Sequence, residues 1–191
     1  SLMWGRPLRS IFALFNSKKI AFQFNHLVSS DEIIIEQDLG LKSKKVKNFK
    51  DYYSFLKSNS IILDHNEREK IILKKINSTS KSKDYKETLN LKLLEEVVNI
   101  VEDPNVLLVN FNKEYLKLPQ EIIISTLEKH QRYFPIFDSR GRLTNNFFVV
   151  ANKKDEKKFI TIGNKRVVEA RLADAKFFWD KDRSKNLIKQ I

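Results

Sequence analysis

The sequence contains no cysteine, and its glycines and histidines are few and scattered. Without cysteine the chain forms no disulfide, no thiolate metal site and no thiol nucleophile, which fits a reducing compartment. The four glycines lie at positions 5, 40, 141 and 163, whereas a phosphate-binding loop needs several glycines close together so that backbone N–H groups approach the anion. The histidines at positions 26, 65 and 130 have none of the short spacings of a zinc site. We therefore assign no catalytic residue, no metal site and no cofactor to this chain.

Long apolar runs are missing as well. No segment approaches the roughly 20 apolar residues that a membrane-spanning helix requires. Residues 1–7 also lack the basic start and apolar stretch of a signal peptide. We therefore expect a soluble, cytoplasmic protein without a membrane partner.

Basic side chains, in contrast, are abundant. Lysine and arginine number 36 against 24 acidic residues, which gives a formal net charge of +12. A charge of this size favours a polyanionic partner, and RNA is the obvious one. Only nine of the 36 are arginines, although the planar guanidinium is the better group for bidentate phosphate recognition. Abundant lysine also arises from coding bias, so composition alone leaves the partner open.

The N-terminal half mixes short apolar patterns with polar breaks. The spacing predicts a short buried helix over 7–15 and strands over 20–24 and 33–35. The most basic window, 41–50, contains no acid and reads as a solvated loop, or as a loop that contacts phosphate. Helices are expected over 51–56, 64–76 and 85–101, with Asp64 and Asp84 as caps. The small polar segment 77–83 between the last two predicts a loop tip or a subdomain hinge near 77–84.

The C-terminal half has clearer patterns. Residues 106–109 predict a strand, and Pro119 opens a helix that carries His130. Two apolar runs, 133–137 and 147–150, flank a glycine turn and predict a hairpin, in which Pro135 favours an edge position. A helical pattern from 164 to 180 closes the chain. Without strict strand–helix alternation, the sequence predicts an α+β fold with a mostly antiparallel sheet, in one domain over residues 1–191.

Several segments resemble a known family in order and approximate spacing. They are Trp4-Gly5, Arg6-Pro7, Val97-Val98-Asn99-Ile100-Val101-Glu102-Asp103-Pro104, Leu118-Pro119-Gln120-Glu121, His130-Gln131-Arg132-Tyr133-Phe134-Pro135, Asn145-Asn146-Phe147, and the run from Gly163-Asn164-Lys165-Arg166 through Ala173-Asp174-Ala175-Lys176-Phe177-Phe178. Together they are similar to the beta chain of bacterial glycyl-tRNA synthetase. The resemblance covers most of the chain and is weakest over about 17–90.

The resemblance implies a holoenzyme of alpha and beta chains that joins glycine to its tRNA with ATP and Mg²⁺, with the catalytic core on alpha. This chain would be an internal, non-catalytic module of the beta chain. Its implied partners are the alpha subunit, the remainder of the beta subunit and glycine tRNA. Two functions stay open at this point: binding or positioning tRNA, and linking protein domains or subunits without touching RNA.

Candidate RNA-binding residues follow from charge and predicted exposure. They are Lys44, Lys45, Lys47, His130, Arg132, Arg140, Arg142, Lys165 and Arg166. Several have a plainer explanation: the lysines of the basic window and the arginines Arg140 and Arg142 can be solvated surface, and His130 can simply end a helix, where a cation interacts favourably with the helix dipole. Arg171 and Asp174, three residues apart on a helix, are expected to pair with each other.

Overall fold

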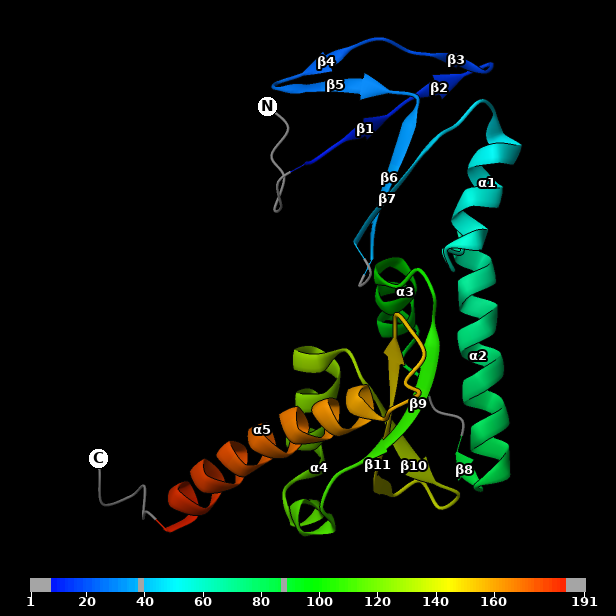
Figure 1. Ribbon diagram of the computed structural model, residues 1–191. Helices are drawn as coiled ribbons and strands as arrows, with labels where there is room; N and C mark the ends of the chain where they lie inside the picture. The colour runs from blue at the N-terminus through cyan, green and yellow to red at the C-terminus, as the bar shows by residue number, and fades with distance from the viewer. Residues whose placement is uncertain (1–7, 38–39, 87–88, 185–191) are drawn as a thin grey trace. The chain divides into compact units, whose positions relative to one another are not determined.

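The computed structural model describes residues 8–37, 40–86 and 89–184, and the chain divides into two compact units, Ser1–Leu63 and Asp64–Ile191 (Figure 1). The expected single domain over 1–191 stays a prediction, because two compact units can belong to one domain. None of the helices in the described ranges combines the length and the apolar character needed to cross a bilayer.

The first unit consists of short strands and one helix. The strands are β1 (Ile11–Phe12), β2 (Leu14–Phe15), β3 (Lys18–Lys19), β4 (Gln23–Phe24), β5 (Leu27–Ser30), β6 (Glu32–Gln37) and β7 (Gly40–Lys45), and the helix is α1 (Phe49–Ser58). β5 pairs with β1 in parallel and with β4 antiparallel. The helix predicted over 7–15 is therefore wrong for its described residues, because a short apolar run rich in isoleucine and phenylalanine suits a strand equally well.

The basic window 41–50 is a loop only at 46–48, because residues 41–45 belong to β7 and residues 49 and 50 begin α1. β7 pairs antiparallel with β6, so that Ile33 faces Lys44 and Ile35 faces Lys42. Lysine fits this position because its aliphatic stem packs along the surface while the ammonium group stays in solvent. The strand predicted over 33–35 is confirmed. The helix predicted over 51–56 is confirmed as α1, whose cap Asn48 accepts a hydrogen bond from the Asp51 N–H at 2.9 Å.

The second unit contains one four-stranded sheet and most of the helices. Its strands are β8 (Tyr85–Lys86), β9 (Asn105–Asn110), β10 (Phe134–Asp138) and β11 (Leu143–Ala151). Its helices are α2 (His65–Ser82), α3 (Leu91–Ile100), the 3-10 helix η1 (Lys113–Lys117), α4 (Gln120–Ser125), the π-helix η2 (Thr126–His130) and α5 (Phe159–Ser184). The sheet order is β8-β10-β11-β9 and every pair is antiparallel. The α+β class with a mostly antiparallel sheet is confirmed.

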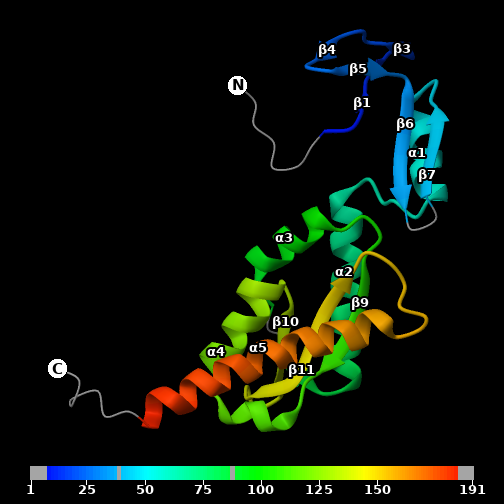
Figure 2. The same ribbon diagram turned by 60° about the vertical axis from the view of Figure 1, so that its left-hand side comes forward.

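Helices cover both faces of this sheet, and each face has its own apolar core. Neighbouring residues of a strand point to opposite faces, so Phe148 packs with α2 and α3 whereas Phe147 packs against α5. On the α5 side, Val168 and Leu172 are fully buried against the sheet and η2. Figure 2 shows α5 lying across the sheet, with α2 on the far side. The sheet thereby holds α5 and the α4–η2 segment next to each other.

The polar segment between the second and third predicted helices is helical to Ser82, so its interpretation as a loop tip is wrong for 77–82, and the subdomain hinge near 77–84 stays a prediction. Its hydroxyls do not break the helix, because Ser78 donates to the Lys75 carbonyl and Ser82 to the Thr79 carbonyl, within the preceding turn. Asp64 caps α2 as expected.

The third predicted helix begins later than its pattern indicated. Asn90, and not Asp84, caps α3 with a hydrogen bond from the Leu93 N–H. Tyr85 and Lys86 instead pair with β10. The expected start at 85 is therefore wrong, and the reason is a tertiary pairing that local spacing does not contain.

The predicted strand at 106–109, the hairpin at 133–150 and the closing helix are confirmed as β9, β10–β11 and α5. The edge position expected from Pro135 is wrong, because β10 lies between β8 and β11. Pro135 is tolerated there because β8 is only two residues long and pairs with Phe137 and Asp138, leaving the other side of Pro135 unpaired by a strand.

Candidate nucleic-acid interface

Three of the segments that carry the family resemblance meet in the second unit. The Tyr133 hydroxyl donates a hydrogen bond to Oδ1 of Asn164, on the first turns of α5. The Tyr133 ring stacks on Phe147, with centroids 5.4 Å apart and an interplanar angle of 20°. Asn164 is itself held by donating Nδ2 to the Ile160 carbonyl at 2.7 Å. These contacts fix α5 against the junction where η2 ends and β10 begins.

That junction positions His130 and Arg132. The π-helix ends at His130, and Arg132 turns the chain with a φ of 59°, a left-handed conformation uncommon for arginine. Nε of Arg132 lies 2.6 Å from Oε2 of Glu96, and one guanidinium nitrogen also donates to the Lys129 carbonyl. Arg132 is therefore already ion-paired, whereas His130 is exposed at the helix end.

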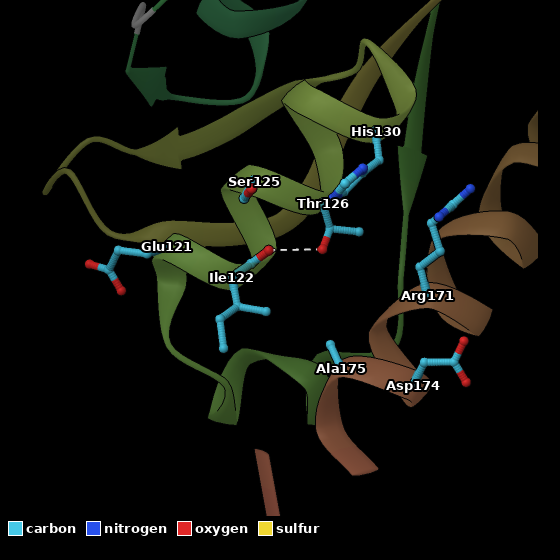
Figure 3. A pocket seen from close by; sticks show the side chains of 8 residues that line it. All are labelled: Glu121, Ile122, Ser125, Thr126, His130, Arg171, Asp174 and Ala175. Atoms are coloured by element: carbon cyan, nitrogen blue, oxygen red, sulfur yellow. Dashed lines mark hydrogen bonds between the residues drawn. The ribbon is translucent and has the colours of Figure 1, made fainter. Parts of the chain in front are cut away.

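A pocket of about 490 Å³ lies between the α4–η2 segment and α5 (Figure 3). Eight residues line it: Glu121, Ile122, Ser125, Thr126, His130, Arg171, Asp174 and Ala175. Figure 3 shows Ile122, Thr126 and Ala175 around its centre, with His130 and Arg171 along one side. The carboxylates of Glu121 and Asp174 point outward in opposite directions in this view. The interior therefore faces apolar and hydroxyl groups, with His130 and Arg171 at its rim.

Sequence reasoning missed Arg171 as a candidate because it assigned the side chain to a pair with Asp174. No ion pair joins these two residues in the part of the chain that the structure describes. The guanidinium instead lies near Tyr133, where its charge lowers a pKa that burial of the phenol raises above the ordinary value. Only the packing of α5 against η2 reveals this position.

The arginines of the β10–β11 turn differ from each other. Nε and one terminal nitrogen of Arg142 each lie 2.8 Å from Oδ2 of Asp138, whose other oxygen accepts from the backbone N–H groups of Arg140 and Arg142. These hydrogen bonds, the Arg142 backbone N–H first, hold the pKa of Asp138 below its ordinary value. Arg142 thus stabilises the turn. The Arg140 side chain is exposed and makes no ion pair within the described ranges.

On α5, the two candidate cations Lys165 and Arg166 differ in their ion pairing. Nζ of Lys165 lies 3.9 Å from Oε1 of Glu169, an oxygen that also accepts from the Asn112 N–H at 2.9 Å. Arg166 is exposed, and among the described residues its side chain has no ion-pair partner. Arg166 is therefore the more available of the two for an external anion.

The three lysine candidates belong to the first unit. Nζ of Lys44 lies 5.9 Å from the centroid of the Phe55 ring, in a cation–π contact. Lys45 forms an ion pair with Asp31 at 3.3 Å. The Lys47 side chain is exposed, and its backbone N–H donates to Asp51 at 3.4 Å. The nine candidates therefore do not form one site: only His130 lines the pocket, and the other eight lie outside it.

Within the described residues, no group of three or more histidine, aspartate or glutamate side chains is arranged to hold a metal ion. The fold and its surface define a basic α+β module, with a helix-covered antiparallel sheet and exposed arginines on one turn and one helix.

Comparison with known proteins identifies the family. The model of the family described as glycyl-tRNA synthetase beta subunit matches residues 1–191, and the chain belongs to this family. The glycine–tRNA ligase beta subunit of Dictyoglomus turgidum is 38% identical over 180 residues, which are 94% of this chain and 26% of that protein. The Clostridioides difficile beta subunit is 37% identical over 188 residues, covering 98% and 27%. The beta subunit of Moorella thermoacetica is 34% identical over 191 residues, covering 100% and 28%. The chain thus spans about a quarter of the length of these relatives.

Proposed function

We propose that this chain is a non-catalytic module of the beta subunit of glycine–tRNA ligase that helps bind or position tRNA for ATP-dependent glycylation. Its partners in this proposal are the alpha subunit, the remainder of the beta subunit and glycine tRNA, in the cytoplasm. ATP and Mg²⁺ belong to the ligation reaction of the whole enzyme, and this module contributes no catalytic residue.

The observation that carries the proposal is the match of the beta-subunit family to all 191 residues. The electrostatics support it, because a net charge of +12 attracts a polyanion and each phosphate contact releases condensed counterions. Arg140 and Arg166 are exposed and have no ion-pair partner among the described residues, so they can bind phosphate without first breaking an ion pair. His130 and Arg171 at the pocket rim add two further donors.

The test uses the complete ligase, with both kinds of subunit, and fluorescently labelled glycine tRNA. Binding is measured by anisotropy across a salt series for the wild type, Arg140→Ala and Arg166→Ala. Each substitution is expected to weaken binding several-fold and to reduce the slope of log affinity against log salt by about 0.7–1. Arg183→Ala is the matched control, because Arg183 is also exposed but is close in sequence to Asp180 and Asp182 in the last turns of α5.

An unchanged affinity and salt slope in both arginine variants would contradict direct tRNA contact by this module. A noncognate tRNA serves as the second comparison. Because phosphate contacts carry no sequence information, the two substitutions should weaken both tRNAs by the same factor.

A second function, an interaction module that links beta-chain domains or the alpha subunit without touching RNA, has its own supporting observation. Phe177 and Phe178 on α5 are 61% and 59% exposed, and their rings meet edge to face at 5.4 Å. Exposed paired aromatics of this kind are typical of protein interfaces. In this case the double variant Phe177→Ala/Phe178→Ala would shift sedimentation of the complete ligase towards separate subunits and leave its tRNA affinity unchanged.

A further inference from the structure

The first turns of α5 expose apolar side chains that lie outside the hydrophobic core. Phe159, the first residue of the helix, is 71% exposed, and Ile162 is 45% exposed. They lie three residues apart, on the same face of the helix. The opposite face carries the fully buried Val168 and Leu172. Phe159 therefore contributes little to the stability of this unit and is available to an external partner.

Basic residues lie close to Phe159 along the chain on both sides. The connection between β11 and α5 and the turns that follow carry six basic residues between positions 153 and 166: Lys153, Lys154, Lys157, Lys158, Lys165 and Arg166. The same segment holds two acids, Asp155 and Glu156. The Asp155 carboxylate is already occupied, because it accepts hydrogen bonds from the Ile160 N–H at 2.9 Å and from the Thr161 N–H and hydroxyl at 2.8 and 2.6 Å. The six basic and two acidic residues give the segment 153–166 a formal net charge of +4.

A glycine on the same face favours close approach by a partner. Gly163 lies inside the helix, where glycine is unfavourable relative to alanine, and a Cβ built on it would meet nothing within 4 Å. Neither helical geometry nor packing within the chain requires glycine there. It lies between Ile162 and Arg166 along the face, and its missing side chain lets a ligand come close to the backbone.

We propose that this α5 entry face, made of Lys154, Lys157, Lys158, Phe159, Ile162 and Arg166, binds a single-stranded segment of tRNA. An unpaired base stacks on the Phe159 ring, and the neighbouring phosphates contact the lysines and Arg166. Aromatic rings combined with a positively charged surface are the recurring solution for unpaired nucleic acid. A protein partner fits less well, because lysine is depleted in the cores of protein interfaces. This inference rests on the proposed function and adds the part of the RNA that is recognised.

The experiment compares Phe159→Ala and Phe159→Trp in the complete ligase, with glycine tRNA as the probe. Loss of one base stack is expected to weaken binding by about 5- to 150-fold. The salt slope should stay at the wild-type value, because no charge is removed. Phe159→Trp should bind as tightly as the wild type, and its added indole fluorescence should be quenched when tRNA is bound.

The matched control is Phe177→Ala, which removes a similarly exposed ring from the other end of the same helix. It should bind tRNA as the wild type does. A fully paired RNA duplex of similar length is the second control, since it offers no unpaired base, and Phe159→Ala should not weaken its binding. Thermal unfolding of Phe159→Ala should match the wild type because the side chain is largely exposed.

The lysines are tested separately with the double variant Lys157→Ala/Lys158→Ala. Its salt slope should fall by about 1.4, as expected for two contacts with a single strand. Lys92→Ala, an exposed lysine on α3, is the control and should leave the slope unchanged.

The outcomes separate this inference from the function on which it rests. If Arg140→Ala weakens binding while Phe159→Ala and Lys157→Ala/Lys158→Ala do not, the module handles tRNA but the α5 entry face does not, and the inference fails alone. If none of these variants changes affinity, both fail. Equal losses for Phe159→Ala on tRNA and on the paired duplex would also overturn base stacking.

Discussion

The hydrogen bond from Tyr133 to Asn164 joins the residue before β10 to α5, and its removal tests how these two elements are held together. The substitution Tyr133→Phe deletes the hydroxyl that donates to Asn164 and leaves the ring in place. The stacking of that ring on Phe147 at 5.4 Å should persist. The measured effect therefore isolates one polar contact from the apolar packing around it.

The expected loss is about 1 kcal/mol in the free energy of unfolding, the usual net value of one hydrogen bond. The loss stays in this range because Asn164 is only half-buried, so water can reach its freed oxygen. For a unit of this size, such a loss lowers the midpoint of thermal unfolding by about 3–5 °C. Tyr53→Phe is the control, since Tyr53 lies on the exposed side of α1.

Urea unfolding of the 191-residue chain, followed by circular dichroism, measures both variants and the double-mutant cycle of Tyr133→Phe with Asn164→Ala. The cycle removes the separate contribution of the bond from Asn164 to the Ile160 carbonyl. We expect a coupling energy of about 0.5–1.5 kcal/mol. A coupling energy near zero would refute the argument that this bond fixes α5 against the start of β10.

Three further predictions concern stability. Leu172→Ala should cost about 2–5 kcal/mol in urea unfolding, because Leu172 is fully buried between α5 and the sheet and its truncation leaves a cavity; Ala170→Gly, on the exposed side of α5, should cost only about 1 kcal/mol. Gly163→Ala should raise the free energy of unfolding by about 0.5–1 kcal/mol, because the new methyl group meets open space in a helical backbone, and a loss would disprove this. Asp138→Asn should destabilise the hairpin at pH 7. The pKa of the Asp138 carboxyl in the folded protein lies below the ordinary value of 3.8. The stability that the carboxylate contributes is therefore present above 3.8 and is lost as the pH falls through the lower folded pKa. Unfolding measured from pH 7 downward should therefore show the difference between wild type and variant shrinking below 3.8.

The parts of the fold that could be predicted are those with long local patterns. The buried positions Val168 and Leu172 repeat at helical spacing, so α5 was visible from the sequence. The β10–β11 hairpin was visible because two apolar runs flank a turn with Gly141, whose φ of 77° suits glycine. Of the short strands before residue 31, only β4 falls within a predicted strand, the one over 20–24. The others were not predicted, because strands of two to four residues depend on partners elsewhere in the chain and carry little periodicity of their own.

In the candidate site, too, features that depend on distant parts of the chain could not be predicted. All nine candidate residues could be selected by charge and residue type, but their availability depends on contacts between distant parts of the chain. Arg132 pairs with Glu96 from α3, and Lys44 lies over the Phe55 ring of α1. Arg171 was missed because its neighbour Asp174 offered a simpler local partner. Phe159 was missed because the closing helix was expected to begin at 164, whereas α5 begins at Phe159.

The sequence by itself determined the family, the basic charge and the positions of the long helices and the C-terminal hairpin, because these depend on residue identity and local periodicity. The tertiary structure decided which face of each helix is covered, which cations are paired and which remain exposed. The physical reason is that burial and ion pairing are formed between segments far apart in the chain. The exposed ring of Phe159 and the open face at Gly163 exist only once Val168 and Leu172 are packed against the sheet.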